Sequence, residues 1–417
     1  MKPASALPAL LLLVVLVAGC ASTSAPTSAN ASTLPCWKDA PSRVGTVAVA
    51  NAAAPRVATP SAAYQAMGFT AADATGNATH RAAWPDLHGA KVVILDHGAF
   101  GYAFGPAKEA FEALTNGTVQ HVASQDAGDL LQRAIAEKGH PTFDVLYGLD
   151  NVLYSRAVSA GILQAYRPLL APRIGASYLV AGPDTWLATP VDHGYIAVNS
   201  DPRKVAAVPT LADLVPRAKQ FVTEDPRQSS VGLGFLVSTV AVFGESCYLA
   251  YWKALLDGGA LVAPDWTSAY ATHFSGGYGQ TATDGSFLGD RPIVASYTTS
   301  PAYELYYGAT TLNNNTLQPG STFHQVETMA LMQGGPDSPA AAQAWIEFTL
   351  TDAFQSLLAS NLAVYPVVPG VEVASVYAGK DPAPGSFIPA DFTADTLGAK
   401  VDGWVKAWTN VYETHQA

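Results

Sequence analysis

The chain has 417 residues, of which 49% are hydrophobic and 13% are charged, whereas a charged share of about 25% is ordinary. Its net charge of −11, from 22 basic and 33 acidic residues, excludes the basic surface that nucleic-acid binding requires. Beyond the N-terminus the longest apolar run, Phe235 to Phe243, is interrupted by Ser238 and Thr239 and falls short of the roughly 18–20 residues of a membrane-spanning helix. A polytopic membrane protein is therefore excluded.

The first twenty residues have the pattern of an export signal. Lys2 precedes an apolar stretch from Ala6 to Val17, which is too short for a stable membrane anchor. The small residues Ala18 and Gly19 before Cys20 resemble the lipobox of bacterial and archaeal lipoproteins, in which the cysteine is lipidated and becomes the new N-terminus. We expect residues 1–20 to be a lipoprotein signal; an ordinary signal peptide with an unrelated cysteine is the alternative.

The remaining cysteines and the histidines carry a weaker signal. With Cys20 lipidated, Cys36 and Cys247 are left in a compartment that permits disulfides, and either a bridge or two separate thiols fits the sequence. The nine histidines do not pair at the spacing of zinc ligands. We expect no metal site and no cofactor.

Residues 21–88 are rich in alanine, serine, threonine and proline. Such a segment buries too little apolar surface to offset its ordering entropy, so its composition predicts a flexible tether. The apolar residues around Tyr64–Phe69 and Trp84 are candidates for docking on the folded body.

From Gly89 onward, predicted strands and helices alternate. The β-branched run Lys91–Asp96 is typical of a strand buried in a parallel sheet. Further strands are predicted at Val119–Ala123 and Phe143–Gly148, and helices at Pro106–Leu114, Asp129–Glu137, after Thr210, from about Phe235, from Ser338-Pro339 to Leu358, and at Thr396–Tyr412. This alternation predicts an α/β fold with mostly parallel sheets. Ligands of such sheets bind beyond the strand ends, here residues 97–100, 125–128 and 148–151.

Five segments carry a resemblance to a known family, and they occur in the family's order. They are Asp144–Asn151 (DVLYGLDN), Asp192–Tyr195 (DHGY), Glu224–Gly234 (EDPRQSSVGLG), Ser296–Tyr303 (SYTTSPAY) and Tyr365–Val367 (YPV). Together they resemble thiamine-binding periplasmic proteins of ABC importers, from about Lys91 to the C-terminus. The resemblance implies a type II periplasmic-binding-protein fold, in which two α/β lobes joined by crossing strands close on a ligand. We expect residues 89–190 with 296–417 to form lobe 1 and residues 191–295 to form lobe 2.

The resemblance also implies ligand contacts at particular positions. The matching residues are Asp126, Ala127, Ser229, Ser230, Trp266, Tyr297, Thr298, Thr299 and Ser300. Ala127 replaces a glycine of the family, His97 replaces a tyrosine after the first strand, and Ala363 replaces a tryptophan before Tyr-Pro-Val. Because those aromatic residues line the ring-binding part of the family's cleft, the ligand is left open between thiamine and another small cation.

These residue types fit a ligand with a cationic ring and a polar tail. Trp266 and Tyr303 could offer aromatic faces, with His97 as a weaker substitute. Asp126 and Asp150 could supply a carboxylate for the cationic ring or the amino group. Ser229 and Ser230 precede a Gly-Leu-Gly turn that predicts a helix from about Phe235, whose N–H groups could hold a hydroxyl or phosphate.

Each of these residues also has a structural interpretation. Asp126 would serve as a helix N-cap, Asp150-Asn151 would tie a turn together, and Trp266 would be core. For Asp225-Pro226-Arg227 we expect a turn in which Arg227 pairs with a carboxylate, and for His193 a strand or hinge position. For Tyr306-Tyr307 we expect local packing.

The expected function is binding rather than catalysis. We expect an extracytoplasmic, lipid-anchored and monomeric solute-binding protein that closes on thiamine or a thiamine phosphate and delivers it to an ABC permease and its ATPase. The alternatives are a polyamine or ferric ion as cargo, or an enzyme resembling thiaminase I, which uses a cysteine nucleophile. Cys36 in the tether and Cys247 in the helix expected after Gly244 do not follow a strand end, and Ser229 lacks a G-x-S-x-G elbow.

Overall fold

A computed structural model describes residues 35–38, 84–178, 186–277, 288–310, 313–377, 382, 387–388 and 392–416. Residues Met1–Leu34 and Pro35–Ala417 form separate units, and all described residues belong to the second. The predicted signal with Cys20 and the segment around Tyr64–Phe69 lie outside the described residues. Within the described part of the chain, helices of membrane-spanning length and hydropathy are absent.

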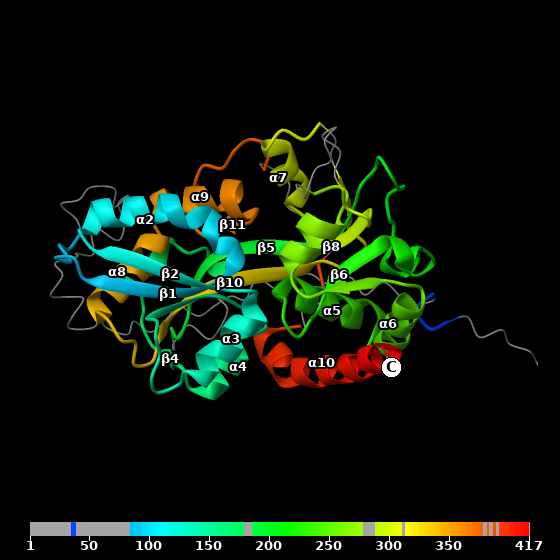
Figure 1. Ribbon diagram of the computed structural model, residues 1–417, viewed down its shortest axis with the longest axis horizontal. Helices are drawn as coiled ribbons and strands as arrows, with labels where there is room; N and C mark the ends of the chain where they lie inside the picture. The colour runs from blue at the N-terminus through cyan, green and yellow to red at the C-terminus, as the bar shows by residue number, and fades with distance from the viewer. Residues whose placement is uncertain are drawn as a thin grey trace, which may run out of the picture. The chain divides into compact units, whose positions relative to one another are not determined.

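Eleven strands of the described residues form one sheet (Figure 1). The strand order is β2-β1-β3-β10-β5-β8-β6-β7, with β4 beside β10 and with β9 and β11 beside β5. The strands are β1 (Lys91–His97), β2 (Thr118–Ser124), β3 (Val145–Asp150), β4 (Leu163–Gln164), β5 (Thr189–Ser200), β6 (Phe221–Glu224), β7 (Leu261–Ala263), β8 (Ile293–Tyr297), β9 (Asn314–Thr316), β10 (Phe323–Met332) and β11 (Tyr365–Pro366).

The sheet is parallel at its two ends and antiparallel in its middle. β1 pairs in parallel with β2 and β3, which together are called the β1 end, and β6 pairs in parallel with β7 and β8, called the β6 end. β5 and β10 run antiparallel to each other, and each runs antiparallel to its other neighbour, β8 or β3. The expected parallel pairing thus holds for the two ends. The middle differs because β5 continues from its pairing with β10 into its pairing with β8 and so joins the ends.

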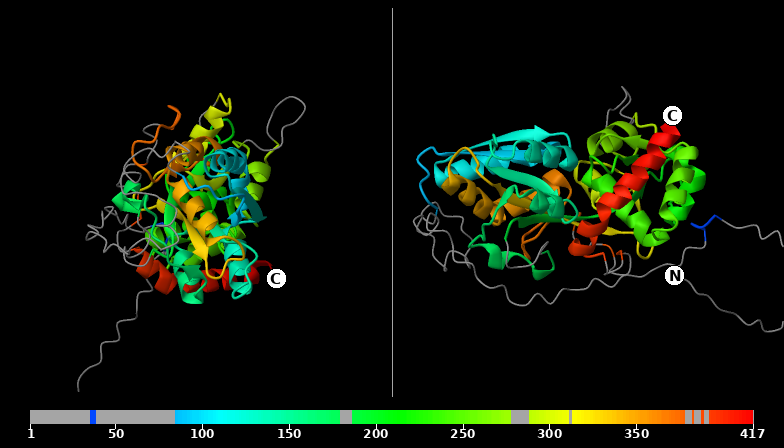
Figure 2. Two further views of the ribbon diagram at one scale, coloured as in Figure 1. Left: turned by 90° about the vertical axis from the view of Figure 1, so that its left-hand side faces the viewer. Right: turned by 90° about the horizontal axis from the view of Figure 1, so that it is seen from below.

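Helices cover both ends of the sheet (Figure 1). They are α2 (Gly101–Thr115), α3 (Ala127–Ala136), α4 (Tyr154–Ala160), α5 (Ser230–Phe243), α6 (Tyr248–Asp257), α7 (Ser300–Tyr306), α8 (Pro339–Thr349), α9 (Asp352–Leu362) and α10 (Ala394–Gln416). Short 3-10 helices lie at Gly98–Phe100, Ala171–Arg173, Ala176–Tyr178 and Leu211–Gln220, and a π-helix at Ser268–His273. α10 contacts α5 and α6 at the β6 end and α4 at the β1 end, along the underside seen in Figure 2.

Several predicted helices have different bounds in the structure; α2, for example, begins at Gly101 rather than at Pro106. The helix expected from Ser338-Pro339 to Leu358 is two helices, because Thr351 is extended and caps α9 through its hydroxyl. The helix expected from about Phe235 begins at Ser230, so Gly232 and Gly234 lie inside α5. A side-chain carbon at Gly232 would lie 2.5 Å from the carbonyl oxygen of Glu224, and one at Gly234 would lie 2.4 Å from Ile196. These glycines therefore permit close packing of α5 rather than a turn.

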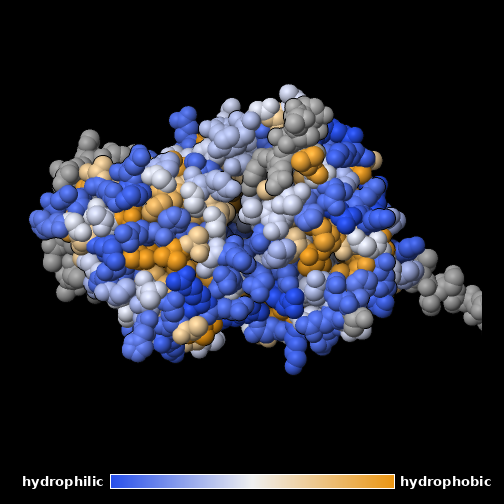
Figure 3. Space-filling view, in the orientation of Figure 1, coloured by the Kyte–Doolittle hydropathy of each residue, from blue (hydrophilic) through white to orange (hydrophobic). Residues whose placement is uncertain are grey.

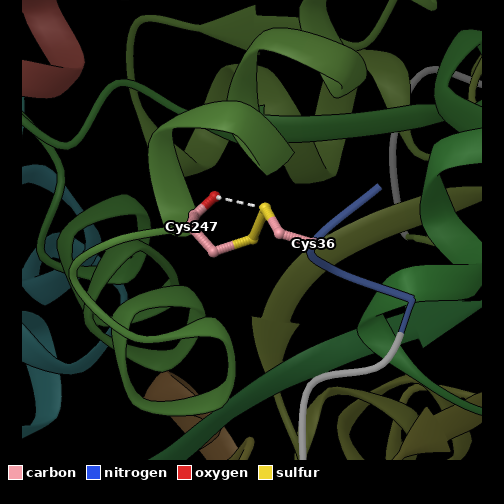
Figure 4. The surroundings of a disulfide bond; sticks show 2 residues. All are labelled: Cys36 and Cys247. Atoms are coloured by element: carbon pink, nitrogen blue, oxygen red, sulfur yellow. Dashed lines mark hydrogen bonds between the residues drawn. A yellow bond between two sulfur atoms is a disulfide. The ribbon is translucent and has the colours of Figure 1, made fainter. Parts of the chain in front are cut away.

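The N-terminal segment is attached to both ends of the sheet. A disulfide joins Cys36 to Cys247, with Cα atoms 6.0 Å apart, which decides the alternative that the sequence left open (Figure 4). Cys247 is the residue before α6 rather than a residue within a helix, contrary to the prediction. Trp84 docks as expected, because it is buried and packs edge-on against Phe348 of α8 with ring centroids 6.3 Å apart.

Candidate functional site

A pocket lies between the β1 end and the β6 end, where several strands finish. In the orientation of Figure 1, the space-filling view shows a hollow near the middle of the surface (Figure 3). The empty space within the pocket is about 540 Å³, which includes space open to solvent. Its lining residues are His97, Ala99, Gln125, Asp126, Ser230, Val231, Trp266, Thr267, Tyr297, Glu327, Leu362 and Val364.

The structure brings five of the sequence-predicted site residues to this pocket and leaves seven outside its lining. The five are His97, Asp126, Ser230, Trp266 and Tyr297. The seven are Ala127, Asp150, Ser229, Thr298, Thr299, Ser300 and Tyr303. Three of the seven, Ala127, Ser229 and Thr298, lie next to a lining residue in the chain. The N–H of Ala127 also donates a hydrogen bond to the lining residue Asp126.

Asp126 is the N-cap of α3, as one interpretation of the sequence has it, and its side chain also lines the pocket. Its Oδ1 accepts a hydrogen bond of 2.7 Å from the N–H of Ala127, which caps α3, and its Oδ2 accepts one of 3.3 Å from the N–H of Trp266. Burial raises the pKa of Asp126 above the ordinary value, although these bonds, the charge of His97 and the hydroxyl of Ser229 oppose the shift. Asp126 therefore lines the pocket and also connects the β1 end to the β6 end.

His97, at the end of β1, faces a carboxylate that sequence reasoning did not find. Its Nε2 lies 3.5 Å from Oε2 of Glu327 on β10, and both side chains are largely buried. Burial by itself would lower the pKa of His97, but the attraction of Glu327, then of Asp96 and Asp126, raises it to about 9. With a pKa of about 9, the His97 imidazole is protonated at neutral pH, beside Glu327.

A buried polar layer supports this wall. The Tyr147 hydroxyl donates to Asp192, whose carboxyl pKa is well above the ordinary range because of burial and the neighbouring Glu327. The Tyr297 hydroxyl donates to Oε1 of Gln325 at 2.7 Å, and Gln325 donates to Asp150 at 3.3 Å.

Asp150 reaches the pocket only through this chain of bonds. Its other oxygen accepts hydrogen bonds from the N–H groups of Val152, at 2.9 Å, and Leu153, at 2.7 Å, so it also ties the turn after β3.

Trp266 supplies an aromatic wall on the side of the β6 end. Its indole is stacked on Tyr270, with ring centroids 5.0 Å apart and an angle of 12° between the planes. Its Nε1 donates to the hydroxyl of Ser296 at 3.0 Å, and that hydroxyl lies 2.9 Å from the hydroxyl of Ser300. Trp266 is partly buried, and its side chain lines the pocket.

The other predicted hydroxyl residues fix local structure. Ser229 caps α5, and its Oγ accepts from the N–H of Gly232 at 3.5 Å. Thr299 donates to the carbonyl of Ala363, which has a left-handed backbone and lies between the lining residues Leu362 and Val364. The pocket wall on either side of Ala363 is therefore aliphatic. Tyr303 packs against Tyr307 on the α7 side, with ring centroids 4.8 Å apart.

Direct contacts join the two sides of the pocket. The N–H of Gly128 in α3 donates to the carbonyl of Gln228 at 2.7 Å. A side-chain carbon at Gly128 would lie 2.6 Å from the carbonyl oxygens of both Arg227 and Gln228, so only glycine permits this approach. The turn expected at Asp225-Pro226-Arg227 is confirmed, because the guanidinium of Arg227 makes hydrogen bonds of 2.6 to 3.0 Å with both oxygens of Asp225.

The remaining candidates lie elsewhere. Cys36 and Cys247 are joined in the disulfide and do not line the pocket. Tyr306 and Tyr307, at the end of α7, are 46% and 58% exposed and do not line it either. Within the described ranges, His, Cys, Asp and Glu side chains form no group of three or more suited to a metal ion.

Comparison with curated proteins finds relatives of one name over most of the chain. The chain is 30% identical over 285 residues to the thiamine-binding periplasmic protein of Brucella abortus, covering 66% of this chain and 79% of the relative. The chain belongs to the family of thiamine-binding periplasmic proteins. It is also 28% identical over 333 residues to the Escherichia coli thiamine-binding periplasmic protein, covering 76% of this chain and 92% of that protein. No family model matches the chain.

Solved structures show the fold of this family member. A periplasmic thiamin binding protein superposes with a TM-score of 0.64 at 26% identity, over 77% of this chain and 96% of that one. Iron-bound HitA from Pseudomonas aeruginosa superposes with a TM-score of 0.61 over 77% of this chain and 99% of that one, and its 17% identity supports the fold alone. The chain has the type II periplasmic-binding-protein fold, as expected.

Proposed function

We propose that this protein captures thiamine or a thiamine phosphate outside the cytoplasm and delivers it to the permease and ATPase of an ABC importer. The mature protein is attached to the membrane through a lipid on Cys20 and acts as a monomer. Support comes from the relatives, which are named thiamine-binding periplasmic proteins, and from the chemistry of the pocket.

The observation that carries the proposal is the pairing of an aromatic face with carboxylates across one pocket. Trp266, backed by Tyr270, faces a pocket that Asp126 and Glu327 also line. A cationic ring gains roughly 0.5–2 kcal/mol from an aromatic face, and a carboxylate adds a charge-assisted hydrogen bond to the ring's amino group. Thiamine has a thiazolium cation and an aminopyrimidine, so it complements both walls.

The polar tail of the ligand has its own complement. Ser230 and Val231 line the pocket at the N-terminus of the fourteen-residue helix α5. Backbone N–H groups at the start of a helix point toward a bound anion or hydroxyl, and the helix dipole favours negative charge there. The hydroxyethyl tail of thiamine, or its phosphate, would bind at this position.

Capture proceeds by hinge closure between lobe 1, residues 89–190 with 296–417, and lobe 2, residues 191–295. Asp126 contacts Trp266 and Gly128 contacts Gln228, so residues of both lobes meet at the pocket. A ligand that touches both walls binds the closed form better than the open one and shifts the equilibrium toward it.

Calorimetry with a panel of ligands tests the cargo. The purified protein is titrated with thiamine, thiamine monophosphate, thiamine diphosphate, spermidine and ferric citrate. We expect tight binding of a thiamine compound alone. The absence of both heat and a thermal shift at about 100 µM thiamine and its phosphates, which would saturate any site tighter than about 10 µM, would reject the cargo. Binding of spermidine or ferric citrate instead would replace it with the polyamine or iron alternative.

The lipid anchor needs a separate test. Expression of the full chain with Cys20→Ser, followed by cell fractionation, should move the mature protein from the membrane fraction to the soluble extracytoplasmic fraction. Mass spectrometry of the wild-type N-terminal peptide should show a diacylglyceryl group on Cys20, and an unmodified cysteine would contradict the anchor.

A further inference from the structure

His97 is held rigidly in the pocket wall by the backbone of a neighbouring strand. Gly148 of β3 has a φ of +114°, and a side-chain carbon there would lie 2.6 Å from Cδ2 of His97. The imidazole therefore lies directly over a position that only glycine can occupy. Tyr147 packs against the ring with centroids 5.1 Å apart, and only 14% of the His97 side chain is exposed.

Acidic groups from each packed element face this imidazole. Glu327 approaches from β10 at 3.5 Å, Asp126 from the start of α3, and Asp96 from β1 itself. Asp96 is also paired with His121 of β2, with Oδ2 and Nδ1 3.0 Å apart. Farther back, Asp192 of β5 accepts from the Tyr147 hydroxyl of β3. Only Glu327 and Asp126 among these acids line the pocket together with His97.

A bound ligand can change the pKa of His97, because that pKa depends on charges inside the pocket. Burial lowers the pKa of His97, and the attraction of the carboxylates, with Glu327 the largest, outweighs burial and raises it to about 9. A cation that enters the pocket beside Glu327 and Asp126 repels the imidazolium and screens the same carboxylates. Burial of the ring is unchanged, so the neutral imidazole becomes favoured.

We propose that His97 is a built-in counter-cation, which pairs with Glu327 in the empty pocket and gives up its proton when a cationic ligand binds beside the carboxylates. The inference rests on the proposed function, because it requires a cationic cargo. A permanent cation must displace a proton, whereas a neutral ligand of the same shape meets an imidazolium that remains paired, so only binding of the cation is linked to proton release.

Linkage then makes capture dependent on pH. A site that releases one proton on binding gains affinity tenfold for each unit of pH while the free site is protonated and the complex is not. We expect thiamine to bind up to tenfold more tightly at pH 8 than at pH 7, with less gain above the pKa of about 9 of the empty site.

The test is calorimetry of thiamine binding in buffers of different ionisation enthalpy. Titrations of the full mature protein at pH 7.5 in phosphate and in Tris report the number of protons released. We expect wild type to release a substantial fraction of one proton and His97→Gln to release none. The control is His88→Gln, because His88 is also paired with an aspartate, Asp86 at 3.3 Å, but is 84% exposed and does not line the pocket.

Histidine-selective NMR of wild type provides a readout that does not depend on the variant folding. The His97 ring should be protonated at pH 7.5 without ligand and neutral with thiamine bound. A ring that stays protonated in the complex, or equal proton release by His97→Gln, overturns the inference while thiamine binding stands. Failure of thiamine to bind at any pH overturns the inference together with the cargo, and the two failures are therefore distinguishable.

Discussion

The histidines on the two faces of the central strands β5 and β10 have pKa values shifted in opposite directions. The face toward the pocket is called the front face. There Asp192 and Glu327 are register partners, and Glu327 lies beside His97. On the back face, Tyr195 is the register partner of His324, and His193 lies beside them with its Nδ1 3.3 Å from Nε2 of His324. The front face holds a charged histidine and the back face holds two neutral ones.

The difference is due to the surroundings of each ring rather than to its depth. On the back face, Tyr178 is stacked on His193 at 4.3 Å and Tyr195 on His324 at 4.6 Å. Burial among these rings lowers the pKa of His324 to about 4, and burial together with repulsion by His324 lowers that of His193. On the front face carboxylates outweigh the same burial. Buried histidine is therefore neutral or charged according to the neighbours that the fold supplies.

The comparison predicts that His324 on the back face lowers the stability of the folded protein at acid pH. The folded-state pKa of His324, about 4, is below the ordinary 6.5, so the unfolded chain binds more protons between these values. Its contribution, about 3 kcal/mol, is complete above pH 6.5 and is lost as the pH falls to 4. Urea unfolding at pH 7 and pH 4 should show a smaller acid loss for His324→Phe, which retains a ring beside Tyr195. Equal losses would contradict the neutral state of His324.

His97 on the front face predicts the opposite pH dependence, a loss of stability at alkaline pH. The folded-state pKa of His97, about 9, is above 6.5, so the folded chain retains the proton between these values. Its contribution, again about 3 kcal/mol, is complete below pH 6.5 and is lost as the pH rises through 9. Unfolding measured at pH 6.5 and pH 9.5 should show a flatter profile for His97→Gln than for wild type. The contribution of His324 on the acid side should remain in this variant, because the back face is unchanged.

Gly128→Ala should disrupt the front face while leaving the back face intact. Its new carbon would lie 2.6 Å from two carbonyl oxygens, so the two sides of the pocket must separate and lose the bond from Gly128 to Gln228. We expect thiamine affinity to fall about hundredfold, which is about 2.7 kcal/mol, and scattering to show a larger radius of gyration with ligand. Gly105→Ala is the matched control, because a side-chain carbon at that helical glycine meets nothing within 4 Å. Wild-type affinity in Gly128→Ala would show that closure does not use this contact.

Trp266→Ala removes the aromatic wall that faces the front-face acids. We expect at least a tenfold loss of thiamine affinity, about 1.4 kcal/mol, with a melting temperature close to wild type. Tyr306→Ala, at an aromatic side chain 46% exposed and outside the pocket lining, should leave affinity unchanged. An unchanged affinity with a lowered melting temperature in Trp266→Ala would assign the ring to the core instead.

Prediction from sequence succeeded where the signal was local or was carried by the family resemblance. The β-branched run at Lys91–Asp96 and the capping residue Asp126 lie where they were expected. Trp266 was found only through the resemblance, since a single tryptophan has no local signature. Gly232 and Gly234 misled the prediction, because a helical glycine that permits close packing has the same sequence pattern as a turn.

Glu327 shows what sequence reasoning missed. It lies on β10, far from His97 in the chain, in a strand that none of the five resembling segments covers. A single glutamate in a strand of mixed polar and apolar residues carries no local sign that a histidine will face it. The only available signal was an isolated charge in a stretch that is otherwise buried.

The sequence by itself determined the α/β class, the helix caps at Asp126 and Ser338 and the family, because these depend on neighbouring residues and on short ordered segments. Only the tertiary structure decided that Cys36 bonds Cys247, 211 residues away, that Asp150 acts through Gln325, and that His97 is charged while His193 and His324 are neutral. The physical reason is that bond formation and proton affinity depend on distances of a few ångströms. The sheet sets those distances between residues that the chain keeps far apart.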